Sequence, residues 1–271
     1  MLNGLTNIGY SLLYDYTKNR WMINECKSRI HGLALVLHHV TDEFVAINDS
    51  CKCTIAEFKE LVSLLTFKGY KFVSITEALK IISNKNPEKF VIMTFDDIPK
   101  SVFFNAYPYL QSLGLPFAVF ITINYLDTEG YITTNQLLEM SVSPLCTIGA
   151  HTLSHPYLRE VENYREELVL SKIALERILN KKVNYMAYPY GQFSTVSRQV
   201  RIAARDAGYL CAFSTIGASL NDNSTKDLFF LPRVAPYPSY DNYRTISFTA
   251  VHAMLSFLSW PIRVLFKKIK K

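Results

Sequence analysis

The strongest constraint on the fold is a unit that repeats along most of the chain: a short run of β-branched or aromatic residues, a turn, and an amphipathic stretch of helical length. This alternation is typical of parallel βα units, in which a helix crosses back over the sheet after each strand. The run 90–95 is apolar on both faces, as expected for a strand that is covered on both sides. The predicted strands are 33–37, 71–74, 90–95, 117–123, 146–149, 184–188, 209–214 and 229–234.

Helices are predicted between these strands from periodicity and from capping residues. Thr54 is suited to be an N-cap and Gly69 to stop a helix, so the clearest helix spans 55–68. Glycines also end two of the other predicted helices, at Gly114 and Gly208. These further helices are 101–113, 158–179 and 195–207.

A single domain is expected over residues 31–243, because no internal repeat and no linker-like tract interrupts the pattern. Residues 1–30 would form an N-terminal extension, and residues 244–271 a tail. A chain of 271 residues is of normal length for one α/β barrel. The pattern therefore predicts a single α/β barrel or an open parallel sheet.

The net charge of +6 is concentrated in the tail, where the chain from Thr245 onward carries five basic residues and no acidic one. The rest of the chain is close to neutral, which argues against a nucleic-acid-binding groove. The tail is predicted to be a basic amphipathic helix, with Leu258, Ile262, Leu265 and Ile269 on one face and Arg263, Lys267 and Lys270 on another. Such a helix would lie on an anionic membrane surface or close the bottom of the barrel, and both alternatives remain open.

The cysteines and the N-terminus indicate where the protein works. Five scattered cysteines, an odd number, favour a reducing compartment. Asp15, Lys18 and Arg20 precede any long apolar stretch, so the N-terminus is a poor secretory signal. We therefore expect a cytoplasmic protein, associated with the membrane if the tail binds there. The oligomeric state is not predicted by any pattern in the sequence.

Polar residues follow the predicted strands at the points where these end. In an α/β barrel or an open parallel sheet, catalytic and ligand-binding residues lie at the carboxyl ends of the strands. We therefore expect these residues to face one mouth of the molecule. They are His38, His39, Asp96, Asp97, His151, Tyr190 and Gly191.

This set has the composition of a metal-dependent hydrolytic site. His151 and His155 are four residues apart, and on a helical turn both would lie on one face and share a cation. Two imidazoles and one carboxylate are enough for a catalytic divalent metal, and a second carboxylate is then free to act as a base. Each part also has an ordinary interpretation: Asp96 and Asp97 as a solvated turn, and the two histidines as a cap and a packing residue.

Three segments resemble known motifs in order and spacing: Thr94-Phe95-Asp96-Asp97, His151-Thr-Leu-Ser-His155-Pro156 and Tyr188-Pro189-Tyr190-Gly191. They are similar to the first three motifs of the polysaccharide deacetylase (NodB-homology) family, carbohydrate esterase family 4. Further similarity extends over 58–74 and 106–121. The resemblance implies a single-domain, distorted (β/α)7–8 barrel of the TIM-like kind.

Carried over to this sequence, the resemblance implies a role for each residue of the site. Asp97, His151 and His155 would be the metal ligands, and Asp96 the general base that deprotonates the attacking water. The backbone N–H of Tyr190 would hold the developing oxyanion, and Gly191 would allow the tight turn beside it.

The general acid is assigned to His38. The segment Leu35-Val36-Leu37-His38-His39-Val40 resembles an early Tyr-His-x-Val motif of one branch of the family, with Leu37 where tyrosine is usual. Other members take this histidine from a late motif, for which His252 is the candidate here, but it falls in the amphipathic tail. His39 would point the other way from an extended strand, so we expect it to be structural.

The sequence departs from the family pattern at three places. Ile98 stands where glycine usually follows the two aspartates, and Ala187 stands where many members have the arginine that orients the base. The fourth motif, with its aspartate and tryptophan, is not visible. Arg233 is a hypothesis for the missing positive charge beside Asp96, with a surface salt bridge as the alternative.

The predicted function is hydrolysis of a non-peptide carbon–nitrogen bond: removal of the acetyl group from an N-acetylhexosamine in a bacterial surface polysaccharide or its precursor. Zinc is the first choice of metal, although the ligand set would accept cobalt, nickel, iron or manganese. Substrate contacts are expected from Tyr188, Gly191 and Arg233. Aromatic side chains suited to stack on a sugar are Tyr107, Tyr109, Tyr188, Tyr190 and Tyr237, of which Tyr190 is preferred.

Two alternatives from other classes remain open. The first is a catalytically silent glycan-binding protein, which the missing arginine and the missing fourth motif favour. The second is a metal-dependent esterase that removes O-acetyl groups, or a hydrolase of a small amide, on the same scaffold.

Overall fold

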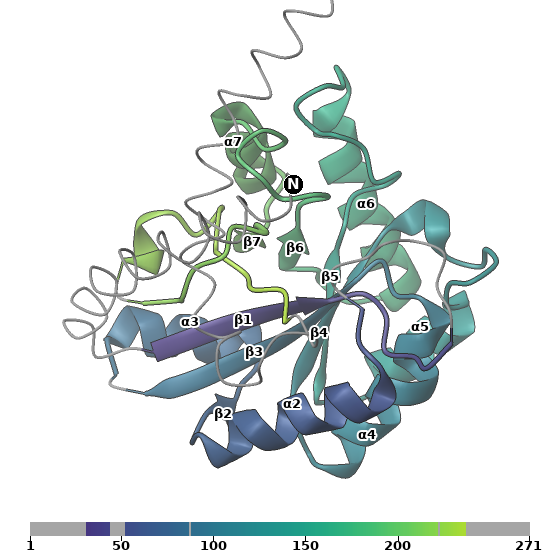
Figure 1. The fold of residues 1–271 in the computed structure, drawn as a ribbon. Helices are drawn as coiled ribbons and strands as arrows, with labels where there is room; N and C mark the ends of the chain where they lie inside the picture. Colours follow the sequence, from purple (N-terminus) through teal and green to yellow (C-terminus); the bar gives the residue numbers. More distant parts are fainter. Residues whose placement is uncertain (1–30, 44–51, 87, 222, 237–271) are drawn as a thin grey trace, which may run out of the picture.

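The computed structural model describes residues 31–43, 52–86, 88–221 and 223–236. Its centre is a curled parallel sheet in which strands follow the order β1-β3-β4-β5-β6-β7, with β2 paired to the start of β3 (Figure 1). The predicted extension 1–30 and tail 244–271 lie outside the described residues. The strands are β1 (His31–Leu37), β2 (Lys71–Phe72), β3 (Lys89–Asp96), β4 (Phe117–Ile121), β5 (Cys146–Ala150), β6 (Tyr185–Ala187) and β7 (Cys211–Phe213).

Helices follow the strands, as βα units require. Thr54 caps the first of them through a capping box, in which its hydroxyl accepts from the Glu57 N–H and the Glu57 carboxylate accepts from the Thr54 N–H. Among the described helices, none combines the length and the apolar character needed to cross a membrane. The α-helices are α2 (Ile55–Phe67), α3 (Ile75–Asn84), α4 (Tyr107–Ser112), α5 (Thr134–Ser141), α6 (Tyr164–Leu179) and α7 (Arg198–Asp206).

Two predicted helices differ most from the structure. The helix predicted at 101–113 is a π-helical segment, Val102–Ala106, followed by α4. Pro108 accounts for the change, since its ring clashes with the carbonyl four residues earlier and its nitrogen cannot donate. The helix predicted at 158–179 begins only at Tyr164, because residues 158–163 form turns.

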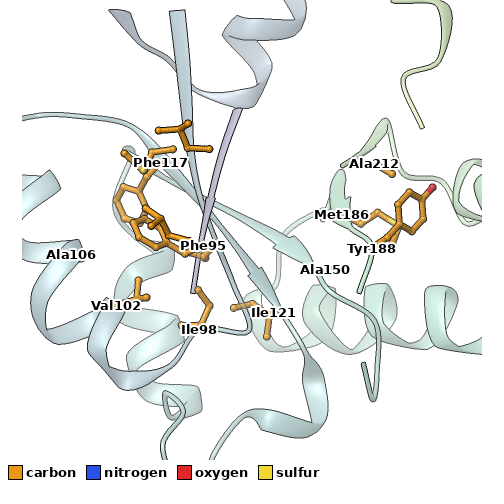
Figure 2. Packing of buried hydrophobic residues seen from close by; sticks show 14 of the residues in the cluster. Phe95, Ile98, Val102, Ala106, Phe117, Ile121, Ala150, Met186, Tyr188 and Ala212 are labelled. Carbon is orange, nitrogen blue, oxygen red and sulfur yellow. The ribbon is translucent and has the colours of Figure 1, made fainter. Parts of the chain in front are cut away.

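The strands bury both faces, and the two-residue period of β3 divides its side chains between them. Val91, Met93 and Phe95 belong to the cluster that packs against α2 and α4, whereas Phe90 and Ile92 point into the inner face of the curled sheet. Figure 2 shows Phe95 in the outer cluster, in contact with Phe117 across the sheet. Asp96 shares the register of Phe90 and Ile92 and is likewise buried.

The sheet is closed between β7 and β1 by an irregular segment rather than by a strand. The strand predicted at 229–234 is present only as isolated parallel bridges, from Leu231 to Phe213 and from Val234 to Leu35. Pro232 lies between the two bridges and has no N–H to continue a ladder. The predicted distorted barrel is thus confirmed in the form of a curled half-barrel sheet, and Arg233 is held between its first and last strands.

Candidate active site

Asp97, His151 and His155 come together at the carboxyl ends of β3 and β5. Each offers one ligand atom, and these three atoms lie within 4.8 Å of one another. Asp97 Oδ1 lies 3.9 Å from His151 Nε2 and 3.8 Å from His155 Nε2. The family resemblance predicted this ligand set, and one carboxylate with two imidazoles is a donor set that suits a divalent metal with open positions.

The surroundings of these three side chains fit a cation as well. The ring of His151 is buried, and its Nδ1 lies 2.8 Å from the carbonyl of Ala187, so Nε2 faces the centre. Thr122 donates a hydrogen bond of 2.9 Å to Asp97 Oδ1 and fixes the carboxylate. Burial and the neighbouring His151 lower the pKa of His155 to about 4, which keeps that ring neutral and able to act as a ligand.

The loop that carries the two histidines is not the helical turn that their spacing suggested. Thr152 and His155 both have left-handed backbones, with φ of 70° and 59°. The Thr152 hydroxyl accepts from the His155 N–H at 3.0 Å, and this contact turns the second ring back toward the first. The centroids of the two imidazole rings are consequently 5.0 Å apart. A tight loop, and not a helical turn, brings them together.

Glu167, which the sequence did not single out, holds this loop from α6. One carboxylate oxygen accepts from the N–H groups of Leu153 and Ser154 at 3.0 and 2.9 Å, and the other accepts from the Ser154 hydroxyl at 2.7 Å. Its side chain is buried although it belongs to a helix that is otherwise rich in exposed charge. No sequence signal separates Glu167 from the exposed Glu166 beside it, except its place on the apolar face of the helix with Leu168 and Ser171.

Asp96 is paired with Arg233 inside the barrel. Two guanidinium nitrogens of Arg233 donate to the two oxygens of Asp96, at 2.7 and 2.6 Å, and Arg233 is held in turn by the carbonyl of Ser214 and the hydroxyl of Thr94. Burial by itself would raise the pKa of Asp96, but Arg233 and His151 outweigh it and bring the pKa below its ordinary value. Asp96 is therefore an ionised carboxylate at neutral pH, with one oxygen 3.7 Å from His151 Nε2.

This placement supports one prediction about Arg233 and corrects another. The hypothesis that it supplies the positive charge beside Asp96 agrees with the geometry. Its expected substrate contact is wrong, since the side chain is buried and its donors are used within the protein. The position of the usual family arginine, Ala187, is also fully buried and instead supplies the carbonyl that orients His151.

His38 lies at the edge of the same centre, just after the end of β1. Its Nε2 is 3.9 Å from Asp97 Oδ2, and its side chain is partly exposed. The backbone carbonyl of His39 accepts from the Cys53 N–H, so the next residue is fixed by the chain that leads into α2. His38 thus borders the centre formed by Asp97, His151 and His155.

The residues of the segment Tyr188–Gly191 differ in how far they are exposed and in what they contact. Tyr190 is 40% exposed, and its ring centroid is 4.8 Å from that of His155. Gly191 has φ of 57°, and an added Cβ would lie 2.5 Å from the backbone nitrogen of Thr215. The expected substrate contact of Tyr188 is wrong, because its ring is buried among Met186 and Ala212 (Figure 2) and its hydroxyl donates to the carbonyl of Phe229.

Other predicted aromatic contacts also belong to the core. Tyr107 packs against Phe117, and Tyr109 packs against Phe58. Tyr237 lies outside the described residues. Ile98, at the position of the usual glycine, has φ of 52° and is fully buried, so packing compensates there for a backbone that β-branched residues disfavour.

Comparisons with known proteins agree with this fold. Residues 83–212 match the family model described as Polysaccharide deacetylase. Protein YxkH of Bacillus subtilis is 25% identical over 211 residues, covering 76% of this chain and 72% of its own length. The poly-beta-1,6-N-acetyl-D-glucosamine N-deacetylase of Staphylococcus aureus is 25% identical over 197 residues, which is 66% of this chain and 66% of that enzyme.

The fold is also similar to solved structures. The polysaccharide deacetylase BC0361 from Bacillus cereus superposes with a TM-score of 0.67 at 24% identity, covering 82% of this chain and 69% of that one. At this identity the likeness establishes the fold.

Proposed function

Because the chain belongs to the polysaccharide deacetylase family, whose members are hydrolases of carbon–nitrogen bonds, we propose that it removes the N-acetyl group from an N-acetylhexosamine of a bacterial polysaccharide or glycan precursor. The observation that carries the proposal is the convergence of Asp97, His151 and His155 beside a buried, ionised Asp96. A site that only bound a cation would have no use for this second carboxylate.

A divalent cation held by Asp97, His151 and His155, with zinc as the first choice, would supply a Lewis acid for the acetyl carbonyl. Asp96 borders the same space and accepts the proton of the attacking water, since Arg233 keeps it ionised. The backbone N–H of Tyr190 is assigned to hold the oxygen that becomes negative in the transition state. The carbon–nitrogen bond then breaks, and acetate and a free amine are released.

The departing nitrogen needs a proton, because an amide anion is a very poor leaving group. We assign the donor to His38, whose Nε2 lies at the edge of the cation centre. A histidine is suited to this role because its ordinary pKa is close to neutral pH.

Turnover is favoured over silent glycan binding by the Arg233–Asp96 pair. The missing arginine at Ala187 is one of two features, with the missing fourth motif, that favour a silent protein, and Arg233 provides a positive charge from a later segment of the chain. An inactive binder would gain nothing from a buried ion pair that is expensive to desolvate.

The test measures amine and acetate separately, on glycans carrying only N-acetyl or only O-acetyl groups. The wild type is expected to release equal amounts of amine and acetate from the N-acetylated glycan, and Asp96→Asn to lose this activity. The surface variant Asp206→Asn serves as the control. Acetate without amine would make the protein an esterase, and release of neither would overturn the proposal.

A contact of the tail with an anionic membrane surface is a separate proposal, resting on the basic amphipathic pattern of 256–271. Co-sedimentation with anionic liposomes, with and without these residues, tests it. Equal recovery of both proteins would contradict membrane binding and would leave packing against the barrel.

A further inference from the structure

The exposed rings of Tyr157 and Tyr190 lie beside the cation centre, and the proposed chemistry uses only the backbone of Tyr190. The rings of Tyr157 and Tyr190 are parallel within 3°, with centroids 3.8 Å apart. Tyr157 is 44% exposed and Tyr190 is 40% exposed, so the pair presents a broad aromatic surface to solvent. Most large aromatic side chains are buried in the core, and aromatic surface that stays exposed commonly serves binding.

The pair is continuous with the site where the reaction takes place. Tyr190 contacts the ring of His155 at 4.8 Å between centroids, and Tyr157 follows His155 by only two residues. A ligand lying on Tyr157 would therefore be next to the cation centre and not in it. This position suits a part of the substrate that binds without reacting.

Both tyrosines are held by their backbones, so the surface is formed before a ligand arrives. The carbonyl of Tyr157 accepts from the Glu160 N–H at 2.7 Å. The carbonyl of Tyr190 accepts from the Thr215 hydroxyl, and the following Gly191 carbonyl accepts from the Thr215 N–H. A preformed surface loses little conformational entropy on binding.

We propose that Tyr157 and Tyr190 form a subsite for a pyranose ring linked to the sugar that is deacetylated, so that Tyr157 sets how tightly a glycan chain binds. The C–H face of a pyranose matches a flat, uncharged aromatic ring, while its hydroxyls remain in water at the edge. The inference rests on the proposed function and assigns Tyr157 a binding role within it.

The kinetic test compares N-acetylglucosamine with a β-1,6-linked pentamer of N-acetylglucosamine. Tyr157→Ala is expected to raise KM for the pentamer about tenfold, as loss of one aromatic stacking contact would. Its kcat for the pentamer should stay within about twofold of wild type, because a contact that is equally strong in the ground state and in the transition state does not affect kcat. Its kcat/KM for the monosaccharide should also stay within about twofold of wild type. Tyr157→Phe, which keeps the ring, should behave like wild type.

Phe67→Ala is the matched control, since Phe67 is an exposed aromatic residue at the last position of α2. Helices of βα units run antiparallel to the strands, so this end lies away from the carboxyl ends of the strands. An unchanged pentamer KM in Tyr157→Ala, or an equal loss on the monosaccharide, would overturn the subsite.

A binding titration separates failure of the subsite from failure of the proposed function. Pentamer is titrated into the full chain carrying Asp96→Asn, with and without Tyr157→Ala, and the expected affinities differ about tenfold. If the wild type hydrolyses no N-acetylated sugar, the proposed function fails, but this affinity difference still supports the subsite. Equal affinities, or no binding in either protein, overturn it.

Discussion

Arg233 donates hydrogen bonds of 2.7 and 2.6 Å to the two carboxylate oxygens of Asp96, inside the closed part of the barrel. The two residues are 137 positions apart in the sequence. Arg233 belongs to the segment that bridges β7 to β1, so the closure of the sheet and the placement of the proposed base are one structural feature. Paired guanidinium and carboxylate groups of this kind fix orientation as well as charge.

Replacing Arg233 with methionine should raise the pKa of Asp96, because burial then acts without an opposing charge. The acid limb of the kcat/KM profile is expected to move to higher pH. At neutral pH the variant should also lose about 3–5 kcal/mol of unfolding free energy in urea, the typical cost of breaking a buried pair. The pKa of Asp96 is depressed in the wild type, so this stability is present above the unfolded value of 3.8 and is lost as pH falls further.

The exposed Arg205→Met is the control for that experiment. An unchanged pH–rate profile in Arg233→Met would show that Arg233 does not set the charge of Asp96.

Replacing Glu167 with glutamine should weaken metal binding about 10- to 100-fold, the usual effect of losing a group that supports a metal ligand. One carboxylate oxygen becomes an amide nitrogen, which would face donors in the loop that carries His155. Competition with a chromophoric chelator measures the affinity, and circular dichroism checks the fold. Glu166→Gln, at the exposed neighbouring position, should bind metal like wild type. Equal affinities in all three proteins would leave Glu167 without a positioning role.

Replacing Gly191 with alanine should destabilise the protein more than the same change at Gly208. Both glycines have positive φ, of 57° and 83°, so both variants strain the backbone. Only at Gly191 would the new Cβ meet backbone, 2.5 Å from the nitrogen of Thr215, whereas at Gly208 its nearest neighbour is the flexible end of Lys172 at 3.8 Å. Urea unfolding should show an additional loss of about 1–3 kcal/mol for Gly191→Ala. Equal losses of unfolding free energy in the two variants would mean that the backbone beside Tyr190 can shift to accommodate the added Cβ.

Replacing His38 with glutamine should reduce kcat on an N-acetylated glycan about 10²- to 10⁴-fold, the usual contribution of a general acid. An aryl acetate has a leaving group that departs without a proton, so its hydrolysis should be much less affected. His39→Gln serves as the neighbouring control and is expected to keep kcat. A similar loss on the glycan and the aryl ester would assign His38 to binding or structure instead.

Much of the fold was predictable because burial on both faces gives parallel strands a distinctive composition. The predicted run 90–95 corresponds to β3, and the Thr54 cap marks the true start of α2. Irregular backbone was not predictable in the same way. The break in the helix before Pro108 and the reduction of the last strand to bridges around Pro232 both follow from missing N–H groups, whose effect depends on the neighbours that tertiary structure provides.

The place of Asp97 and His151 was predictable because parallel topology gathers the strand ends, whereas His155 was predicted from its spacing to His151 and from the family motif. The groups that support the centre were not. Glu167 lies on a helix that could equally present it to solvent, and the stacking of Tyr157 on Tyr190 depends on how two loops meet. Such contacts join segments that are far apart in the sequence, and the periodicity of the sequence does not show that these segments meet.

The most direct test of the account is metal analysis of the purified full chain beside His155→Ala, after dialysis against excess zinc and then metal-free buffer. The account predicts about one zinc ion per wild-type chain, as expected for a three-ligand site, and clearly less than that in the variant, with both proteins folded. Equal zinc content in the two proteins, or a wild type that retains none, would contradict a shared cation at Asp97, His151 and His155.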